Sequence, residues 1–277
     1  MQKLYKIVPA LGWILIAVMI SSCRMQDAKS PEEWFKDTWS GLAGVDTLTF
    51  HGKAALWRGE NGELEQNLSY TGQMDDHHQL TIRTVIAEGE QKGRLQTSGQ
   101  RKDEVHEAKL QALNRHWHIV SDPETLGSGL ARLNPLEQLE QIQKANKTIK
   151  MESGAARGTR VLRIELDSKD ALHLMAAGLE EEMNQIREKW DGELAKLPST
   201  KRGKVSSQAE QIYSYGKEQL AQMLNQADIQ AVYHLTIDRK TGLPLRLTSE
   251  SRLAYLSPQG AAQQEMLRTD NRFTNYK

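Results

Sequence analysis

The chain contains 277 residues, of which 26% are charged and 38% belong to the hydrophobic set, a composition that fits one or two globular domains and excludes a disordered or polytopic membrane protein. Lysine plus arginine and aspartate plus glutamate both number 36, so the balanced charge gives no basis for nucleic-acid binding. The single cysteine excludes an intrachain disulfide and a cysteine-based zinc or iron–sulfur centre.

The N-terminus has the pattern of a signal peptide. Two lysines precede a run of fourteen uncharged residues, 7–20, and Ser21 and Ser22 stand directly before Cys23. As a helix this run would span only ~21 Å, which is short of the ~30 Å hydrocarbon core of a bilayer. We therefore expect a cleaved signal peptide over residues 1–22 rather than a permanent transmembrane helix.

The segment Ile20-Ser21-Ser22-Cys23 resembles the bacterial lipobox. The resemblance implies that Cys23 is acylated and becomes the new N-terminus after cleavage, with residues 23–30 as the lipidated cysteine and a polar tether. It also implies a cell-membrane location on the extracytoplasmic face, or an outer membrane if the organism has one. A buried or idle cysteine that happens to end a signal sequence is the alternative.

The first helix of the domain is expected to follow Ser30. Ser30 suits the N-cap, Pro31 the first turn, and Glu33 completes a capping-box spacing. We expect the apolar face of this helix to pack on a core, and contact with the lipid interface is the alternative. That face consists of Trp34, Phe35, Trp39 and Leu42.

A period of two predicts that most of the remaining chain is antiparallel sheet. Residues 48–56 alternate, residues 59–62 form a turn, and a second run places Leu64, Leu68 and Tyr70 on one face of a hairpin. Further strands are expected at residues 80–86, 110–120 with a turn at Asn114-Arg115, 148–152, 161–166, 229–237, 245–255 and 266–276.

Two helical segments interrupt the strands. Asn134-Pro135-Leu136-Glu137 predicts the start of a short helix. Residues 168–227 show helical periodicity broken at Pro198, which predicts a long αα-hairpin. We expect its apolar stripes to bury against each other and the sheet, and a methionine-rich lid over a pocket is the alternative. The stripes contain Leu172, Met175, Leu179, Met183, Ile186, Trp190, Ile212, Leu220, Met223 and Leu224.

Catalytic and metal-binding motifs are absent from the sequence. It has no phosphate-binding glycine loop, no His-Glu-x-x-His and no Gly-x-Ser-x-Gly. His116 and His118 would share one strand face, but nothing fixes further ligands beside them, so no metal site is expected. Residues 180–182 are all glutamate and are expected to face solvent. We expect no enzymatic activity and no cofactor.

Four short motifs, in this order along the chain, are similar to a known family. They are 114–118 (NRHWH), 134–139 (NPLEQL), 233–238 (YHLTID) and 241–244 (TGLP). Together with the lipobox and the opening helix, they resemble the bacterial lipoprotein carrier superfamily of LolA and LolB, with LppX-like lipoproteins and the germination lipoprotein GerS. The likeness covers most of residues 31–277.

The resemblance implies an α+β domain over residues 31–277, built on a strongly curved antiparallel β-sheet. This sheet would form an incomplete β-barrel with helices covering its concave side, often around an apolar cavity. The αα-hairpin of residues 168–227, inserted before the last strands, is longer than the cover helices of carrier proteins.

Two classes of function follow, both without nucleic acid. The first is a membrane-anchored lipoprotein that binds lipid or another amphiphile in the half-barrel. The second is a GerS-like envelope lipoprotein that contacts a protein partner or a second copy of itself. An open pocket would favour the first, and a packed interior with an exposed apolar stripe on the hairpin the second. The expected ligand contacts are Leu48, Phe50, Leu80, Ile82, Met175, Met183 and Met223.

Overall fold

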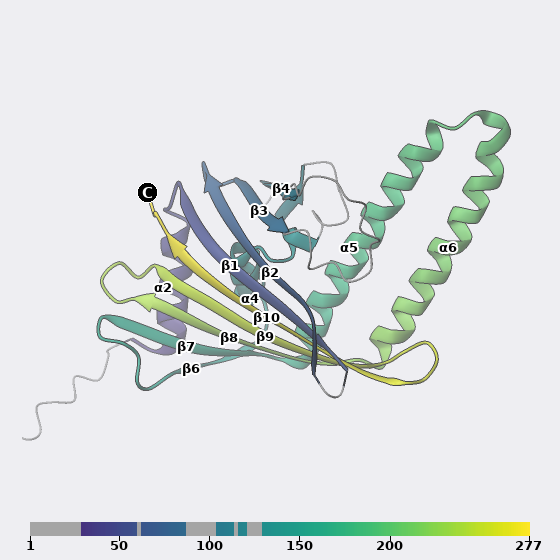
Figure 1. Ribbon diagram of the computed structural model, residues 1–277. Helices are drawn as coiled ribbons and strands as arrows, with labels where there is room; N and C mark the ends of the chain where they lie inside the picture. The colour runs from purple at the N-terminus through teal and green to yellow at the C-terminus, as the bar shows by residue number, and fades with distance from the viewer. Residues whose placement is uncertain (1–28, 60–61, 87–103, 114–115, 121–128) are drawn as a thin grey trace, which may run out of the picture.

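The computed structural model describes residues 29–59, 62–86, 104–113, 116–120 and 129–277, and within them ten strands form a single antiparallel sheet (Figure 1). The strand order is β5-β4-β3-β2-β1-β10-β9-β8-β7-β6, so β5 and β6 are the two edges and the sheet is open. The strands are β1 Leu48–Arg58, β2 Glu63–Asp75, β3 Gln79–Ile86, β4 Glu104–Leu113, β5 His116–Ile119, β6 Lys147–Met151, β7 Thr159–Leu166, β8 Asp228–Asp238, β9 Pro244–Leu256 and β10 Ala262–Thr274.

Pairing of β1 with β10 joins the first and second halves of the chain. The register places Phe50 opposite Phe273 and Leu56 opposite Leu267. All other neighbouring strands follow one another in sequence, so this one long-range pair makes two meanders into one sheet.

Two short helices lie on one face of the sheet: α2, Pro31–Leu42, and α4, Pro135–Lys144 (Figure 1). At the start of α2 the amide of Glu33 donates to Ser30 Oγ over 3.1 Å, and the Ser30 amide donates to Glu33 Oε2 over 2.6 Å. The amide of Leu136 donates to Asn134 Oδ1 over 3.0 Å at the start of α4. Both expected helix starts are therefore present.

We call the sheet face beneath these helices the covered face and the opposite one the open face. Trp34 and Phe35 of α2 and Leu139 of α4 belong to the same buried cluster as the inward side chains of the strands. The fully buried members of that cluster include Leu48, Phe50, Leu80, Ile82, Leu162, Ile164, Leu235, Ile237 and Leu247. This arrangement of a curved, open antiparallel sheet with helices on one side confirms the expected α+β half-barrel class.

One predicted side-chain direction is wrong. In the pairing of β1 with β2 the register shifts between Leu56 and Trp57, so Leu56 lies opposite Gln66 whereas Trp57 lies opposite Leu64. The extra residue of this bulge, Glu65, turns Leu64 to the open face, away from Leu68, and leaves it 57% exposed. Alternation in the sequence cannot show such an inserted residue.

The helical hairpin is present, but the expected burial of its apolar stripes is only partial. It consists of α5, Ser168–Ala195, and α6, Ser199–Asn225, and Figure 1 shows both helices extending away from the sheet. Ala171 is the buried residue of α5, and α6 has none. A 28-residue helix is ~42 Å long, and beyond its first turns α5 leaves the sheet, with Leu179, Met183 and Trp190 half-buried and Ile186 44% exposed.

The core has a tight contact at Gly72, directly opposite Phe50 on the neighbouring strand. A Cβ atom built at Gly72 would lie 2.0 Å from the Phe50 ring, and Phe50 is fully buried. The ring therefore occupies the space that any other residue at position 72 would need.

Gly72→Ala should lower the free energy of unfolding by ~3 kcal/mol or more, because the buried ring has no room to move. The matched control is Gly178→Ala in α5, where no atom lies within 4 Å of the new methyl group. That change should stabilise the protein by up to ~1 kcal/mol. Urea denaturation measures the free energy of unfolding of both variants. Equal stability of the two variants would contradict the packing described.

Candidate functional site

The four ligand contacts expected from the strands lie in the sealed core. Leu48, Phe50, Leu80 and Ile82 are between 0% and 1% exposed and pack together on the covered face. Water barely reaches these side chains, so in this conformation they do not line an open cavity. Their role in ligand binding stays a prediction.

The three expected methionines occupy different parts of the hairpin. Met175 lies near the start of α5 and packs against the core cluster. Met183 lies farther along α5, and its Cε is 3.6 Å from a Cβ built at Gly216 of α6, so it packs between the two helices. Met223 is half-buried near the end of α6. Met175 therefore packs against the cluster to which the four strand residues belong, whereas Met183 and Met223 are not among the residues that pack against it. Cys23 lies outside the described residues.

Part of the covered face is not sealed. The strands β1 and β10 continue past the buried cluster, where their inward side chains are Leu56 and Leu267, opposite each other in the register. Leu56 is half-buried and Leu267 is 36% exposed. We call this part of the covered face the uncovered end, and its inward side chains are Leu56, Arg58, Leu68, Ser251, Leu253, Tyr255, Glu265 and Leu267.

The uncovered end joins the core on one side and the base of the hairpin on another. Leu68 and Leu253 are half-buried and contact the core cluster, as does Met175. Ser251 lies opposite Leu267, and Ser249 with Thr269 form a buried hydroxyl pair at 2.6 Å in the adjoining row. The helices α5 and α6 contact β8 and β9 respectively. The leucine side chains of the uncovered end thus border the small side chains of Ser249, Ser251 and Thr269.

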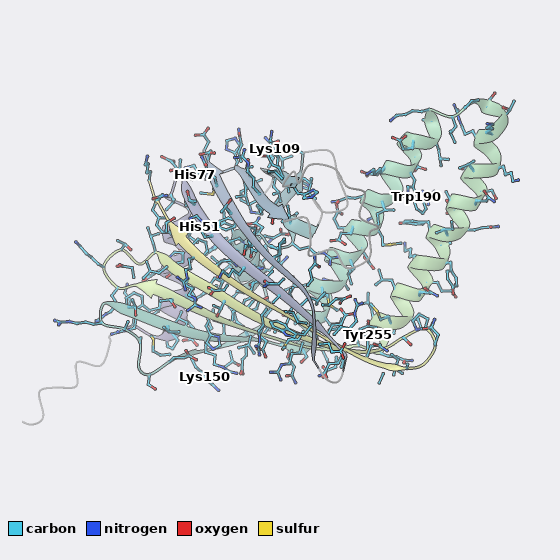
Figure 2. All side chains as sticks on the ribbon, viewed as in Figure 1. His51, His77, Lys109, Lys150, Trp190 and Tyr255 are labelled. Carbon is cyan, nitrogen blue, oxygen red and sulfur yellow. The ribbon has the colours of Figure 1, made fainter. Side chains whose placement is uncertain are left out.

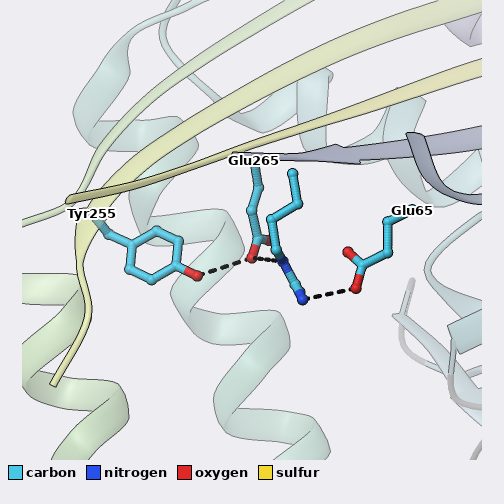
Figure 3. Close-up of polar contacts among 4 residues, drawn as sticks. Glu65, Tyr255 and Glu265 are labelled. Carbon is cyan, nitrogen blue, oxygen red and sulfur yellow. Dashed lines mark hydrogen bonds and ion pairs between the residues drawn. The ribbon is translucent and has the colours of Figure 1, made fainter. Parts of the chain in front are cut away.

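A polar cluster borders this apolar surface (Figure 3). Glu265 accepts hydrogen bonds from Arg58 Nε over 3.0 Å and from the Tyr255 hydroxyl over 2.9 Å, and Arg58 Nη1 contacts Glu65 over 2.8 Å. Burial, reinforced by the bond to Glu265, raises the pKa of Tyr255, so the hydroxyl remains a donor at neutral pH. An apolar strip that ends at charged and hydroxyl groups matches the two ends of an amphiphile.

Sequence reasoning placed Leu253 and Leu267 in strands but not in a site. Their alternation marks them as inward-facing residues, and inward-facing residues are normally buried. What distinguishes them is the distance to the covering helices, which has no signal in the local sequence.

The hairpin also exposes apolar side chains. Ile212 and Tyr215 of α6 are each 63% exposed, and Ile186 of α5 is 44% exposed. Trp190 lies on α5 well away from the sheet (Figure 2). None of the helices in the described ranges is long and apolar enough to cross a membrane. Within those same ranges, no three His, Cys, Asp or Glu residues are grouped so as to hold a metal ion.

Comparison with protein-family models gives no match. A curated relative, kynurenine 3-monooxygenase from Phaeosphaeria nodorum, is 36% identical over 67 residues. This segment covers 24% of the present chain and 14% of the length of that enzyme, so it assigns no family.

The solved structures with similar features include members of the predicted group. A LolA superfamily protein from Nitrosomonas europaea is 7% identical, with a TM-score of 0.25 over 90% of this chain and 94% of its own. A putative outer membrane lipoprotein-sorting protein domain from Vibrio parahaemolyticus is 12% identical, with a TM-score of 0.27 over 89% of this chain and 94% of its own. Lipovitellin is 7% identical, with a TM-score of 0.31 over 83% of this chain and 25% of its own. Scores this low carry no functional argument, and the fold class rests on the strand order and helix placement above.

Proposed function

We propose that this protein is a non-enzymatic, membrane-anchored lipoprotein that binds a lipid or another amphiphile at the uncovered end of the sheet. The observation that carries the proposal is the half-exposed strip of Leu56, Leu253 and Leu267, which is continuous with the core and ends at the Arg58 and Glu265 pair. Contiguous apolar surface that stays in contact with water is unfavourable in a free protein and favours a ligand with apolar chains.

The placement of the methionines supports the same surface. Met175, near the start of α5, packs against the same core cluster as Leu253 of the uncovered end, and Met223 is half-buried near the end of α6, the helix that contacts β9. Methionine adapts its flexible thioether to irregular apolar shapes, as a surface that accepts acyl chains requires. The polar cluster around Arg58 would then contact the head of the ligand.

Leu267→Glu should weaken binding of an apolar fluorescent probe by about tenfold, because a carboxylate in the strip must be desolvated when the probe binds. The melting temperature should change little, since Leu267 is already 36% exposed. A fluorescence titration with a long-chain fatty-acid probe measures the effect.

The matched control is Leu256→Glu, which places the same charge on the same strand pair but on the open face, at a residue 42% exposed. This variant should bind the probe as well as the unmodified protein. An equal loss of probe binding in the Leu267→Glu and Leu256→Glu variants, or no probe binding by the unmodified protein, would refute the proposed site.

The membrane anchor in this proposal is Cys23. Cys23→Ala should leave an unprocessed precursor and release no lipidated form, because the acyl chains attach to the cysteine sulfur. Metabolic labelling with a palmitate analogue and membrane fractionation measure both effects. Normal processing and unchanged labelling of the variant would exclude Cys23 as the anchor.

A second candidate function is contact with another protein through the hairpin, and the exposure of Ile212 and Tyr215 is the observation that favours it. If these residues join two copies of the chain, the double change Ile212→Glu and Tyr215→Glu should convert a dimer to a monomer without lowering the melting temperature. Light scattering determines the oligomeric state. A monomeric unmodified protein would exclude the homodimer.

A further inference from the structure

A hollow of about 640 Å³ lies on the open face, on the opposite side of the sheet from the proposed amphiphile site. It extends over β4, β3, β2, β1 and β10, and the polar residues Ser69 and Thr71 contribute to its lining. Its ionisable lining residues include Lys53, Arg83, Asp270 and Arg272, together with the imidazole of His51. Positive groups thus gather here although the whole chain carries no net charge.

The register shows how closely these groups are placed. His51 lies opposite Arg272 on one side and opposite Thr71 on the other, and Thr71 lies opposite Arg83. Arg272 in turn lies opposite Arg246 of β9. Like charges in directly opposed positions of neighbouring strands repel each other, and this repulsion is offset in part by Asp270, which lies opposite Lys53.

The carboxylates of this face are already engaged. Both oxygens of Asp270 accept hydrogen bonds from Arg246 over 2.7 Å. These bonds hold the pKa of Asp270 below its usual value, and the nearby charges of Arg272 and Lys53 add to the effect. Glu107, on β4, pairs with Arg83.

Glu250, on β9, is also engaged, and pairs with Arg252 at 2.6 Å and with Arg268 at 2.7 Å. Within the part of the chain that the structure describes, Lys53, Arg272 and His51 form no hydrogen bond or ion pair of their own. All three are exposed on one side of the same two strands. Asp270 lies opposite Lys53 in the register and attracts both Lys53 and Arg272, but its two oxygens are hydrogen-bonded to Arg246. Within the described residues, Lys53 and Arg272 therefore keep donors that no carboxylate accepts.

We propose that this hollow binds a phosphate group, held by Lys53 and Arg272 and bordered by the hydroxyl groups of Ser69 and Thr71. Guanidinium and ammonium groups form strong charge-assisted hydrogen bonds to phosphate oxygens, and hydroxyl groups add neutral donors. The hollow is larger than a single phosphate, so it has room for a phosphate ester. The phosphate belongs either to a soluble ester or to the head group of a membrane phospholipid.

The test uses the full chain and the double variant Lys53→Gln with Arg272→Gln. Glycerol 1-phosphate, followed by isothermal titration calorimetry, represents the soluble ester. Vesicles of phosphatidylglycerol and of phosphatidylcholine represent the membrane. The ratio of the protein bound to the two kinds of vesicle cancels any contribution of the lipid anchor. The double variant should bind the phosphate probe at least ~10-fold more weakly, because two charge-assisted contacts are removed.

The matched control removes two positive charges elsewhere, with Lys150→Gln and Lys240→Gln. Both lysines are exposed, and Lys150 lies on β6, far from His51 (Figure 2). Binding of the control should equal that of the unmodified protein. The melting temperature of the Lys53 and Arg272 variant should change little, because the change relieves the repulsion between Arg272 and Arg246 but also removes two positive charges that attract Asp270.

Each outcome decides the proposal. Loss of glycerol 1-phosphate binding in the double variant alone assigns a soluble ester, and loss of the preference for phosphatidylglycerol vesicles alone assigns a lipid head group. Failure of the unmodified protein to bind either probe, or equal loss in the control, overturns the phosphate site. Binding of an apolar probe at Leu267 is measured separately, so this site and the amphiphile site can fail independently.

Discussion

The length of the strands relative to the helices that cover them is the constraint on which the structure depends. Strands β9 and β10 each contain 13 residues and extend ~43 Å, whereas α2 with 12 residues and α4 with 10 are ~18 and ~15 Å long. Two helices of this size seal one region of the covered face. The strands then continue beyond them with the same inward alternation, so apolar side chains remain in contact with water.

This mismatch divides the covered face into two parts with different roles. The sealed part, where Phe50 packs against Gly72, supplies the stability of the fold and leaves no space for a ligand in the conformation described. The uncovered end, around Leu267, is half-exposed and bordered by the polar cluster of Arg58 and the base of the hairpin. A rigid region beside an accessible one is a common arrangement for binding, because the ligand contacts a surface that is already formed.

The sequence was sufficient to predict the strands, the capped helices and the αα-hairpin, because each depends on local periodicity and turn chemistry. It was not sufficient to predict the burial of the hairpin or the direction of Leu64, which depend on helix length relative to the sheet and on a bulge at Glu65. The basic row at His51 and Arg272 was also missed. These residues are far apart in sequence and meet only through the pairing of β1 with β10.

The most direct measurement is photo-crosslinking with a fatty acid that carries a diazirine at the end of its chain, followed by mass spectrometry of the labelled peptides. The account predicts labels on inward-facing residues of the uncovered end, such as Leu56, Leu253 and Leu267, and at the base of the hairpin near Met175 and Met223. Labels confined to the exposed surface of α6 around Ile212, or spread evenly over the protein, would contradict it.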